Sequence, residues 1–297
     1  MDCALAVKRR HALHQHPELS DHEHVTAKTI ASWIADMVQT KSSSLDCKLT
    51  HFSNCAALAV TLTASDAGPS TLLRCELDAL PIPETIQTEY RSQNDGCSHR
   101  CGHDGHAAII LGVIQVLLSE PSLLQCGRVV CLFQPAEETG AGAAQVIAAP
   151  EWPDIRCQYA FALHNVPGLV EGAIYVRAGT LACASRGIKV SLQGHHAHAA
   201  HPEDGHSPSV ALARLLLALE AVNAQSHDDV YMVTVTYAQL GTAPNYGIAP
   251  GEAVVQATLR TSSDAAMSHL VAEVEGIVAA VCSGKRWVRC CEVACAL

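Results

Sequence analysis

Eight consecutive residues, His99 to His106 (HRCGHDGH), constrain this chain more than any other stretch. They hold three imidazoles, a thiol and a carboxylate, which are side chains that bind transition metals. The apolar run 107–118 that follows is typical of a buried helix and is too short to cross a bilayer. The donors therefore lie on a turn at a helix N-terminus, where the helix dipole favours thiolate and carboxylate. A lone histidine in a loop is more often not a ligand, but this combination indicates half of a metal site.

The composition is globular and excludes several classes of protein. The 297 residues are 49% hydrophobic and 16% charged, which is enough for one large or two ordinary domains. The formal net charge of −10, with no cluster of lysine or arginine, argues against a nucleic-acid partner. We expect no membrane partner, because no run approaches 20 apolar residues, and no secretory signal. Fourteen cysteines, several in apolar runs, then predict a reduced, cytoplasmic protein rather than a disulfide scaffold.

The first half of the chain indicates helices and strands in alternation. We expect a helix over residues 5–40, interrupted around Pro17, with Asp21 as the N-cap of its second part. Alternating or continuous apolar patterns predict strands at 55–63, 71–77, 127–134 and 159–163.

Metal-binding side chains follow three of these strands directly. Asp78 follows the second strand, Glu137 and Glu138 follow the third, and His164 follows the fourth. Open α/β sheets bind ligands at the carboxyl ends of their strands. Asp78 taken alone could equally cap a helix or turn. Together with the Cys/His turn, however, these residues predict an α/β domain with a metal site at its strand ends.

From residue 182 the pattern changes to strand, helix, strand, strand, helix, strand. These elements are expected at 185–193, 207–222, 230–240, 251–261, 265–282 and 286–295. This order is that of a ferredoxin-like unit, a sheet with helices on one face. We therefore predict two domains, a metal-binding α/β domain over residues 1–181 and a ferredoxin-like α+β domain over residues 182–297.

A set of motifs occurs in a characteristic order along the chain. They are LHQHPE (13–18), LRCELDALP (73–81), CGHDGH (101–106), FQPAEE (133–138), LH (163–164) and the stretch 194–202 around His198. The set resembles the amidohydrolase branch of the aminoacylase/carboxypeptidase metallopeptidase clan, which includes hippurate hydrolases and plant auxin–amino acid conjugate hydrolases. The resemblance covers essentially the whole chain. It implies a metallopeptidase-like catalytic domain and a second domain through which the chain forms a homodimer.

The resemblance also implies an activity and a cofactor. The expected reaction is metal-dependent hydrolysis of the amide bond of N-acyl amino acids or short peptides. Two divalent metal ions would serve it, and the donor types suit zinc, manganese or cobalt. The implied metal ligands are Cys101, His103, Glu138 and His164.

Further roles come from the same resemblance. Glu137 matches the general base, which takes a proton from water and passes it to the leaving amine. His198 matches a histidine that holds the substrate or its oxyanion, often in the partner subunit's site. Asp78 and Asp104 are expected to orient the ligand residues without binding the metal themselves. The substrate's carboxylate is expected to meet Asn245 and Arg260, since a guanidinium can bind a carboxylate with two hydrogen bonds.

The chain departs from the family pattern at several positions. Arg100 stands where Ala is usual, Glu76 where Asp is usual, and Glu203 where His is frequent. Family members also return to the first domain and add a last metal-binding histidine, whereas the tail 290–297 contains no histidine. We therefore expect a truncated member, with an incomplete catalytic domain, that binds one metal, or two weakly, and hydrolyses slowly or not at all.

Two other interpretations stay open at this point. The chain could be an inactive relative that serves only as a metal-binding or dimerising module. A cysteine-based redox protein is disfavoured, because the sequence has no Cys-x-x-Cys. Several histidines also have ordinary interpretations: His14 and His106 as structural or supporting residues, and His195, His196 and His201 as solvated loop residues. For His99 the sequence favours neither interpretation.

Overall fold

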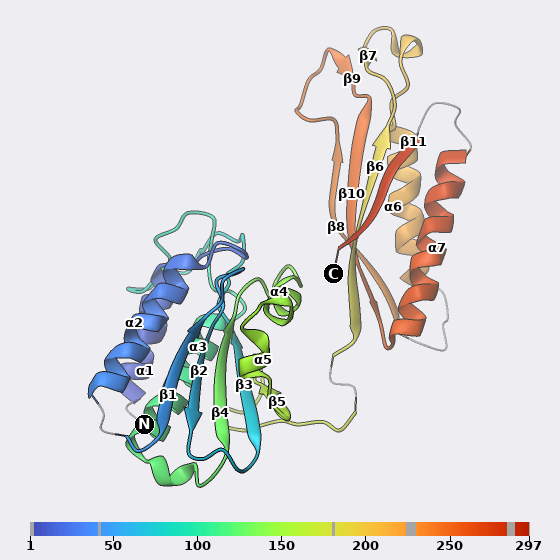
Figure 1. Cartoon of the computed structure of the whole chain (residues 1–297). Helices are drawn as coiled ribbons and strands as arrows, with labels where there is room; N and C mark the ends of the chain where they lie inside the picture. The colour runs from blue at the N-terminus through green and yellow to red at the C-terminus, as the bar shows by residue number, and fades with distance from the viewer. Residues whose placement is uncertain (1–2, 41–42, 180–181, 224–229, 284–288, 297) are drawn as a thin grey trace. The chain divides into compact units, whose positions relative to one another are not determined.

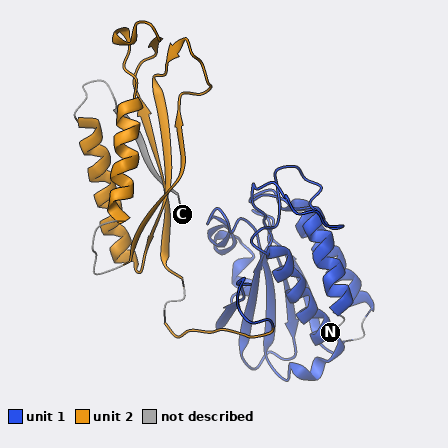
Figure 2. Ribbon diagram, turned by 180° about the vertical axis from the view of Figure 1, so that it is seen from behind, with its two compact units in different colours: residues 1–171 blue, residues 172–297 orange. Residues whose placement is uncertain are grey.

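The computed structural model describes residues 3–40, 43–179, 182–223, 230–283 and 289–296. The chain forms two compact units, Met1–Glu171 and Gly172–Leu297 (Figure 2). The boundary expected between residues 181 and 182 adjoins residues 180–181, which lie outside the described residues. Each unit has its own sheet and its own hydrophobic core.

A five-stranded mixed sheet forms the centre of the first unit, in the order β1-β2-β4-β3-β5. Its strands are β1 (Asp46–His51), β2 (Leu58–Thr63), β3 (Ser70–Glu76), β4 (Arg128–Gln134) and β5 (Tyr159–Ala162). The strands β3, β4 and β5 are parallel, whereas β1 and β2 are antiparallel additions. Parallel strands end at the same edge of a sheet, so the residues that follow β3, β4 and β5 meet there.

Helices cover both faces of this sheet (Figure 1). One face carries α1 (Cys3–Gln15), α2 (His24–Thr40) and α3 (His103–Ser119), and the other carries α4 (Gly142–Ala148) and α5 (Trp152–Ile155). A short 3-10 helix, Pro121–Leu123, precedes β4. On the first face Ile34, Ile114 and Phe133 are fully buried in one cluster. On the second face Val146 and Ile155 are buried in another. Burying each such side chain contributes about 1.5–3 kcal/mol.

The start of α2 differs from the sequence expectation. The helix begins at His24, and Asp21 has a left-handed φ of 66°, so Asp21 as the N-cap is wrong. The carboxylate of Glu18 instead accepts the N–H groups of Val25 and Thr26, at 3.2 and 2.7 Å. These amides lack partners inside the helix, and a carboxylate near them is also favoured by the helix dipole.

The second unit is a four-stranded antiparallel sheet in the order β11-β6-β10-β8. Its strands are β6 (Ala184–Gln193), β8 (Tyr231–Leu240), β10 (Glu252–Thr261) and β11 (Arg289–Ala296). The helices α6 (Ser209–Asn223) and α7 (Asp264–Ser283) cover one face (Figure 1). Along β10 the buried residues alternate with less buried ones, because one face meets the helices. A second small sheet pairs β7 (Ala197–His198) with β9 (Ile248–Ala249), and a short 3-10 helix spans Pro202–Asp204.

Helix α7 is, among the described residues, the single helix long and apolar enough to cross a membrane. It passes on the mean hydropathy of 18 residues and is not a continuous apolar run, because it contains Glu273 and Glu275. Met267, Leu270, Val274 and Val278 on this helix are nevertheless buried in the core of the second unit. The core helix of a globular domain passes the same test, so one such helix is weak evidence for a membrane span.

Candidate metal centre

The residues expected to bind metal come from four places at one edge of the first sheet. Glu137 and Glu138 lie in the turn after β4, and His164 is the second residue after β5. His103 is the first residue of α3, and Cys101 precedes it in the Gly-containing turn. The parallel arrangement of β3, β4 and β5 is the reason why these distant segments meet.

His103 lies at the centre of this group, with a side chain that is 0% exposed. Its Nδ1–H donates to the backbone oxygen of Asp78 at 2.8 Å, and an Asp78 carboxylate oxygen lies 3.3 Å away. The proton is thereby placed on Nδ1, and Nε2 keeps its lone pair. Nε2 is buried, has no hydrogen-bond partner among the described residues, and faces Glu137 and Glu138 at 3.6 and 3.9 Å. A buried, unpaired nitrogen opposite two carboxylates fits a divalent cation.

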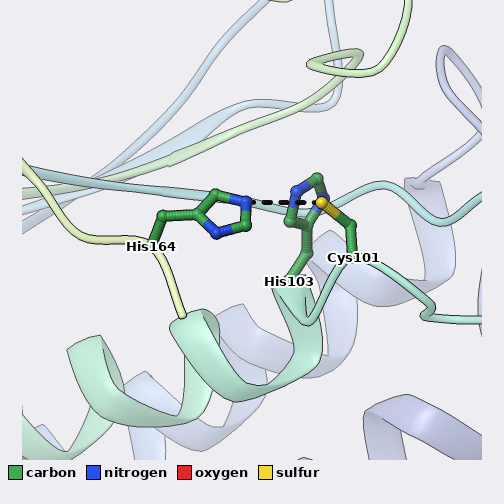
Figure 3. Close-up of side chains that lie close together, drawn as sticks. All are labelled: Cys101, His103 and His164. Carbon is green, nitrogen blue, oxygen red and sulfur yellow. Dashed lines mark hydrogen bonds between the residues drawn. The ribbon is translucent and has the colours of Figure 1, made fainter. Parts of the chain in front are cut away.

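Cys101 and His164 meet beside His103 (Figure 3). The Nε2 of His164 lies 3.3 Å from the Sγ of Cys101. The Nδ1–H of His164 donates to the backbone oxygen of Asn165 at 2.7 Å, so its Nε2 also carries a lone pair. One ligand atom from each of Cys101, His103 and His164 lies within 4.8 Å of the others, and the same holds for His103, Glu137 and Glu138. A third group, Glu76, His103 and His106, is fully buried, so the described residues offer three overlapping donor groups that share His103.

The charges of the cluster shift the pKa values of its own members. Burial, followed by the nearby Glu138 and Glu137 carboxylates, raises the pKa of the Cys101 thiol to about 12. Burial also raises the pKa of Glu138, although its contact with Cys101 and the proximity of His103 oppose the shift. The excess of negative charge is what a divalent cation would offset, and thiol, imidazole and carboxylate donors together suit zinc, manganese or cobalt.

Asp78 connects two of the expected ligands. Its carboxylate accepts the backbone N–H of Glu138 at 2.9 Å and the hydroxyl of Ser20 at 2.7 Å. Burial opposes ionisation, but the hydrogen bonds from His103, from the Glu138 amide and from Ser20 lower the pKa of Asp78 to about 2. The side chain is therefore an anion that contacts both His103 and the turn carrying Glu138.

The same turn depends on a second carboxylate that the sequence analysis missed. Ala136 has a left-handed φ of 49°, and its buried N–H donates to an oxygen of Glu23 at 2.6 Å. Glu23 directly precedes α2, where an acidic residue is ordinarily explained by the helix dipole. Nothing in the sequence pattern therefore pointed from Glu23 to the turn after β4.

A hydrogen-bonded chain packs the Cys101 turn against the His164 segment. The Nδ1–H of His106 donates to the Glu76 carboxylate at 2.7 Å, and the N–H of Asn165 donates to His106 Nε2 at 3.0 Å. Glu76 also pairs with Arg74. Gly102 lies against the same segment: a Cβ there would lie 2.2 Å from the side-chain oxygen of Asn165. Both ring nitrogens of His106 thus contact protein groups, so His106 fits the role of a residue that supports the ligands rather than binding metal itself.

Asp104 contacts α1 rather than the metal ligands. One of its oxygens accepts from His14 Nδ1 at 2.9 Å and from Arg10 Nε at 3.3 Å. The other ring nitrogen of His14 lies 3.1 Å from Glu84. The hydrogen bond with Asp104, and then Glu84, raises the pKa of His14 although burial opposes this. His99 is buried, and burial lowers its pKa to about 4.

Three expected site residues lie in the second unit, all of them exposed. His198 is in β7, and its Nδ1 accepts the N–H of Ala200 at 3.1 Å. Asn245 lies between β8 and β9, and its side-chain oxygen accepts the N–H of Gly247 at 2.8 Å. Arg260 lies on β10. These residues belong to a different unit from the strand-end cluster.

The sequence and the fold are similar to those of known proteins. The sequence model of the family described as peptidase family M20/M25/M40 matches residues 72–292. An N-acetyl-L-cysteine deacetylase of Bacillus subtilis (strain 168) is 33% identical over 254 residues, which cover 85% of this chain and 58% of the relative. An IAA-amino acid hydrolase of Arabidopsis thaliana is 29% identical over 261 residues, covering 87% of this chain and 56% of the relative.

A solved structure agrees with these sequence similarities. It is that of a dinuclear metal-binding peptidase from the M20 family of Bacillus subtilis, with a TM-score of 0.70 and 26% identity. The match covers 99% of this chain and 73% of that chain, whereas this chain spans just over half the length of the two curated relatives. The family match over most of the sequence, together with a mixed α/β fold similar to that of a solved family member, shows that this chain belongs to the peptidase family M20/M25/M40.

Proposed function

We propose that this chain hydrolyses the amide bond of N-acyl amino acids or short peptides, with Glu137 as the general base. The observation that carries the proposal is the buried, unpaired Nε2 of His103, which faces Glu137 and Glu138. The names of the relatives, a deacetylase and an amino acid hydrolase, support acyl amino acids as the substrate class. The proposed metal ligands are Cys101, His103, Glu138 and His164.

In the proposed reaction the ions and the side chains have different roles. A bound divalent ion would supply Lewis acidity, which lowers the pKa of water and polarises a carbonyl. Glu137 is 38% exposed beside the buried His103, so its carboxylate can reach both the ligands and an incoming substrate. In the proposed reaction Glu137 accepts a proton from the attacking water and returns it to the leaving amine nitrogen. Asp78, and less directly Asp104, would hold the surrounding groups in place.

The second unit is proposed to complete the substrate site. Because Nδ1 of His198 accepts a backbone N–H, its proton lies on Nε2, which can donate to an oxyanion. We propose this role for His198, in its own or a partner's site, and we propose that Asn245 and Arg260 bind the substrate carboxylate. The strand order β11-β6-β10-β8 supports a ferredoxin-like unit, and we propose that it mediates a homodimer. Exposed Met232, Tyr237 and Leu240 on the sheet-edge strand β8 support such a contact.

The identity of the ions and the location of the protein are narrower proposals. Two divalent ions are proposed because a solved structure similar to this chain is described as a dinuclear metal-binding peptidase, and zinc, manganese and cobalt each accept thiol, imidazole and carboxylate ligands. A cytoplasmic location is proposed because the cysteines whose side chains the structure describes are all free thiols, which suit a reducing compartment.

The proposed function is tested with the purified chain, loaded in turn with zinc, manganese and cobalt. N-acetyl-L-cysteine and a panel of other N-acetyl amino acids are the substrates, and bound metal is counted by elemental analysis. Replacing Glu137→Gln is expected to lower kcat by about 10²–10⁴-fold, because the general base is lost, without lowering the metal content. Glu89→Gln, an exposed glutamate of the same unit, is the matched control and should retain full activity.

The same experiment separates the two functions considered from the sequence. Hydrolysis that a chelator abolishes and that depends on Glu137 supports the enzyme. Metal binding without hydrolysis by any loaded form would instead support a metal-binding or dimerising module, and hydrolysis that survives Glu137→Gln would refute the assigned base.

A further inference from the structure

We propose that Glu23 is a positioning residue for Glu137: its buried carboxylate holds the left-handed turn at Ala136 and thereby directs the general base toward the metal ligands. The inference rests on the function proposed above. It adds a residue from the loop before α2, far from the catalytic motifs in the sequence.

The contact between Glu23 and the turn is short and buried. Glu23 is 0% exposed, and its Oε1 accepts the N–H of Ala136 at 2.6 Å across 113 positions of sequence. Its Oε2 has no hydrogen-bond partner among the described residues. A buried carboxylate is costly, and one with an unpaired oxygen is more so. The hydrogen bond from the Ala136 N–H is, however, shorter than most N–H···O hydrogen bonds, so this contact can fix the backbone of the turn.

The turn needs such a contact because its backbone is strained. Ala136 has a φ of 49°, where the Cβ of an L-residue approaches the following carbonyl oxygen too closely. Strain of this kind persists only where the surroundings hold it, and it occurs frequently at active sites. The carbonyl of Ala136 accepts the N–H of Gly142 at 3.0 Å. Gly142 leaves no room for a side chain, since a Cβ there would lie 1.6 Å from the Pro135 oxygen.

Glu137 is the residue between two anchored amides. Glu23 holds the N–H of Ala136 before it, and Asp78 holds the N–H of Glu138 after it. Without Glu23, the buried N–H of Ala136 loses its acceptor. Rotation of Ala136 out of the left-handed region then relieves both the backbone strain and the cost of the unpaired N–H. That rotation redirects Glu137, whereas the amide of Glu138 stays attached to Asp78. The expected defect is therefore in proton transfer rather than in metal binding.

The first test needs neither metal nor activity. In the ¹⁵N-labelled full chain, the amide proton of Ala136 should resonate downfield and exchange slowly, because it donates to a carboxylate. We expect Glu23→Ala to abolish both features and Glu23→Gln, which keeps an acceptor oxygen, to retain part of them. Glu84→Ala is the matched control, since Glu84 is also buried and accepts the backbone N–H of Ser92 at 2.8 Å. An unchanged Ala136 amide in Glu23→Ala would overturn the proposal, whether or not the chain hydrolyses anything.

The second test uses the metal-loaded chain. Glu23→Ala should lower kcat by about 10²-fold, since a misplacement of roughly 1 Å has such an effect, with KM and metal content unchanged. Adding Ala136→Gly should restore part of kcat, because glycine adopts the left-handed conformation without a steric penalty. Glu84→Ala should leave the kcat of the folded protein unchanged. A loss in Glu23→Ala no larger than in this control would overturn the proposal. If the unsubstituted chain shows no hydrolysis, the proposed function fails, and the amide measurement alone decides the role of Glu23.

Discussion

Asp78 contacts His103 twice, through its backbone oxygen at 2.8 Å and through its carboxylate at 3.3 Å from the same ring nitrogen. The imidazole consequently presents its other nitrogen to the carboxylates after β4. A carboxylate behind a histidine fixes the tautomer and raises the basicity of the nitrogen that faces a metal. Because Asp78 also holds the amide of Glu138, one side chain orients both sides of the candidate metal centre.

Replacing Asp78→Ala is expected to weaken zinc binding by about 10–100-fold, the usual effect of removing such a supporting group. The backbone acceptor of His103 survives this substitution, so the loss arises from the missing carboxylate and from the unpaired amide of Glu138. Competition with a chromophoric chelator measures the affinity. Glu84→Gln, at a buried carboxylate that pairs with His14, serves as the control. Equal affinities in both variants would contradict the role given to Asp78.

The thiol of Cys101 is expected to bind the metal directly. The cobalt-loaded chain should then show the near-ultraviolet charge-transfer band of a thiolate ligand, and Cys101→Ser should remove it. Cys97→Ser is the control, because Cys97 is a buried thiol four positions away, and burial raises its pKa. Survival of the band in Cys101→Ser, or its loss in Cys97→Ser, would assign the sulfur ligand differently.

The strand-end cluster could be predicted from the sequence because it depends on parallel strands. Apolar runs followed by Asp78, Glu137-Glu138 and His164 imply a common edge once the strands are parallel. The strands β2 to β5 lie where their apolar patterns placed them, to within a few residues. The edge strand β1 was missed, since DCKLTH has few apolar residues and only Thr50 of it is buried.

Contacts between distant loops could not be predicted in the same way. Glu23 and Ala136 are 113 positions apart, and nothing in their neighbours' periodicity connects them. The left-handed φ of Ala136 was equally hidden, because alanine gives no sign of it. The sequence could indicate which residues bind metal or transfer protons. The identity of the residues that hold those side chains in position depends on how the loops pack against one another.

The conformation of the turn before α3 leads to a stability prediction. Gly102 has a φ of 100°, and Gly96 has a φ of 75°. Alanine at either position incurs the left-handed penalty of about 1–2 kcal/mol. A Cβ at position 102 would also lie 2.2 Å from the side-chain oxygen of Asn165, whereas position 96 has nothing within 4 Å. Urea denaturation should therefore show a larger loss of unfolding free energy for Gly102→Ala than for Gly96→Ala. Equal losses would show that the Asn165 side chain moves aside freely.

The pairing of His14 predicts a pH dependence of stability. The hydrogen bond with Asp104, and then Glu84, raises its pKa above the ordinary 6.5, although burial opposes this. A raised pKa in the folded state means that the native protein binds the proton more tightly than the unfolded chain does. The resulting stabilisation is fully present below pH 6.5 and is lost as the pH rises through the folded pKa.

His14→Gln removes this contribution, so its cost in unfolding free energy should be largest below pH 6.5 and should shrink at higher pH. Denaturation by urea at several pH values from 6 to 9 measures the difference between the variant and the unsubstituted chain. His16→Gln, at an exposed histidine two positions further along, is the matched control variant. A pH-independent difference for His14→Gln would mean that folding leaves the pKa of His14 unchanged, and it would contradict the stabilisation assigned to this pairing.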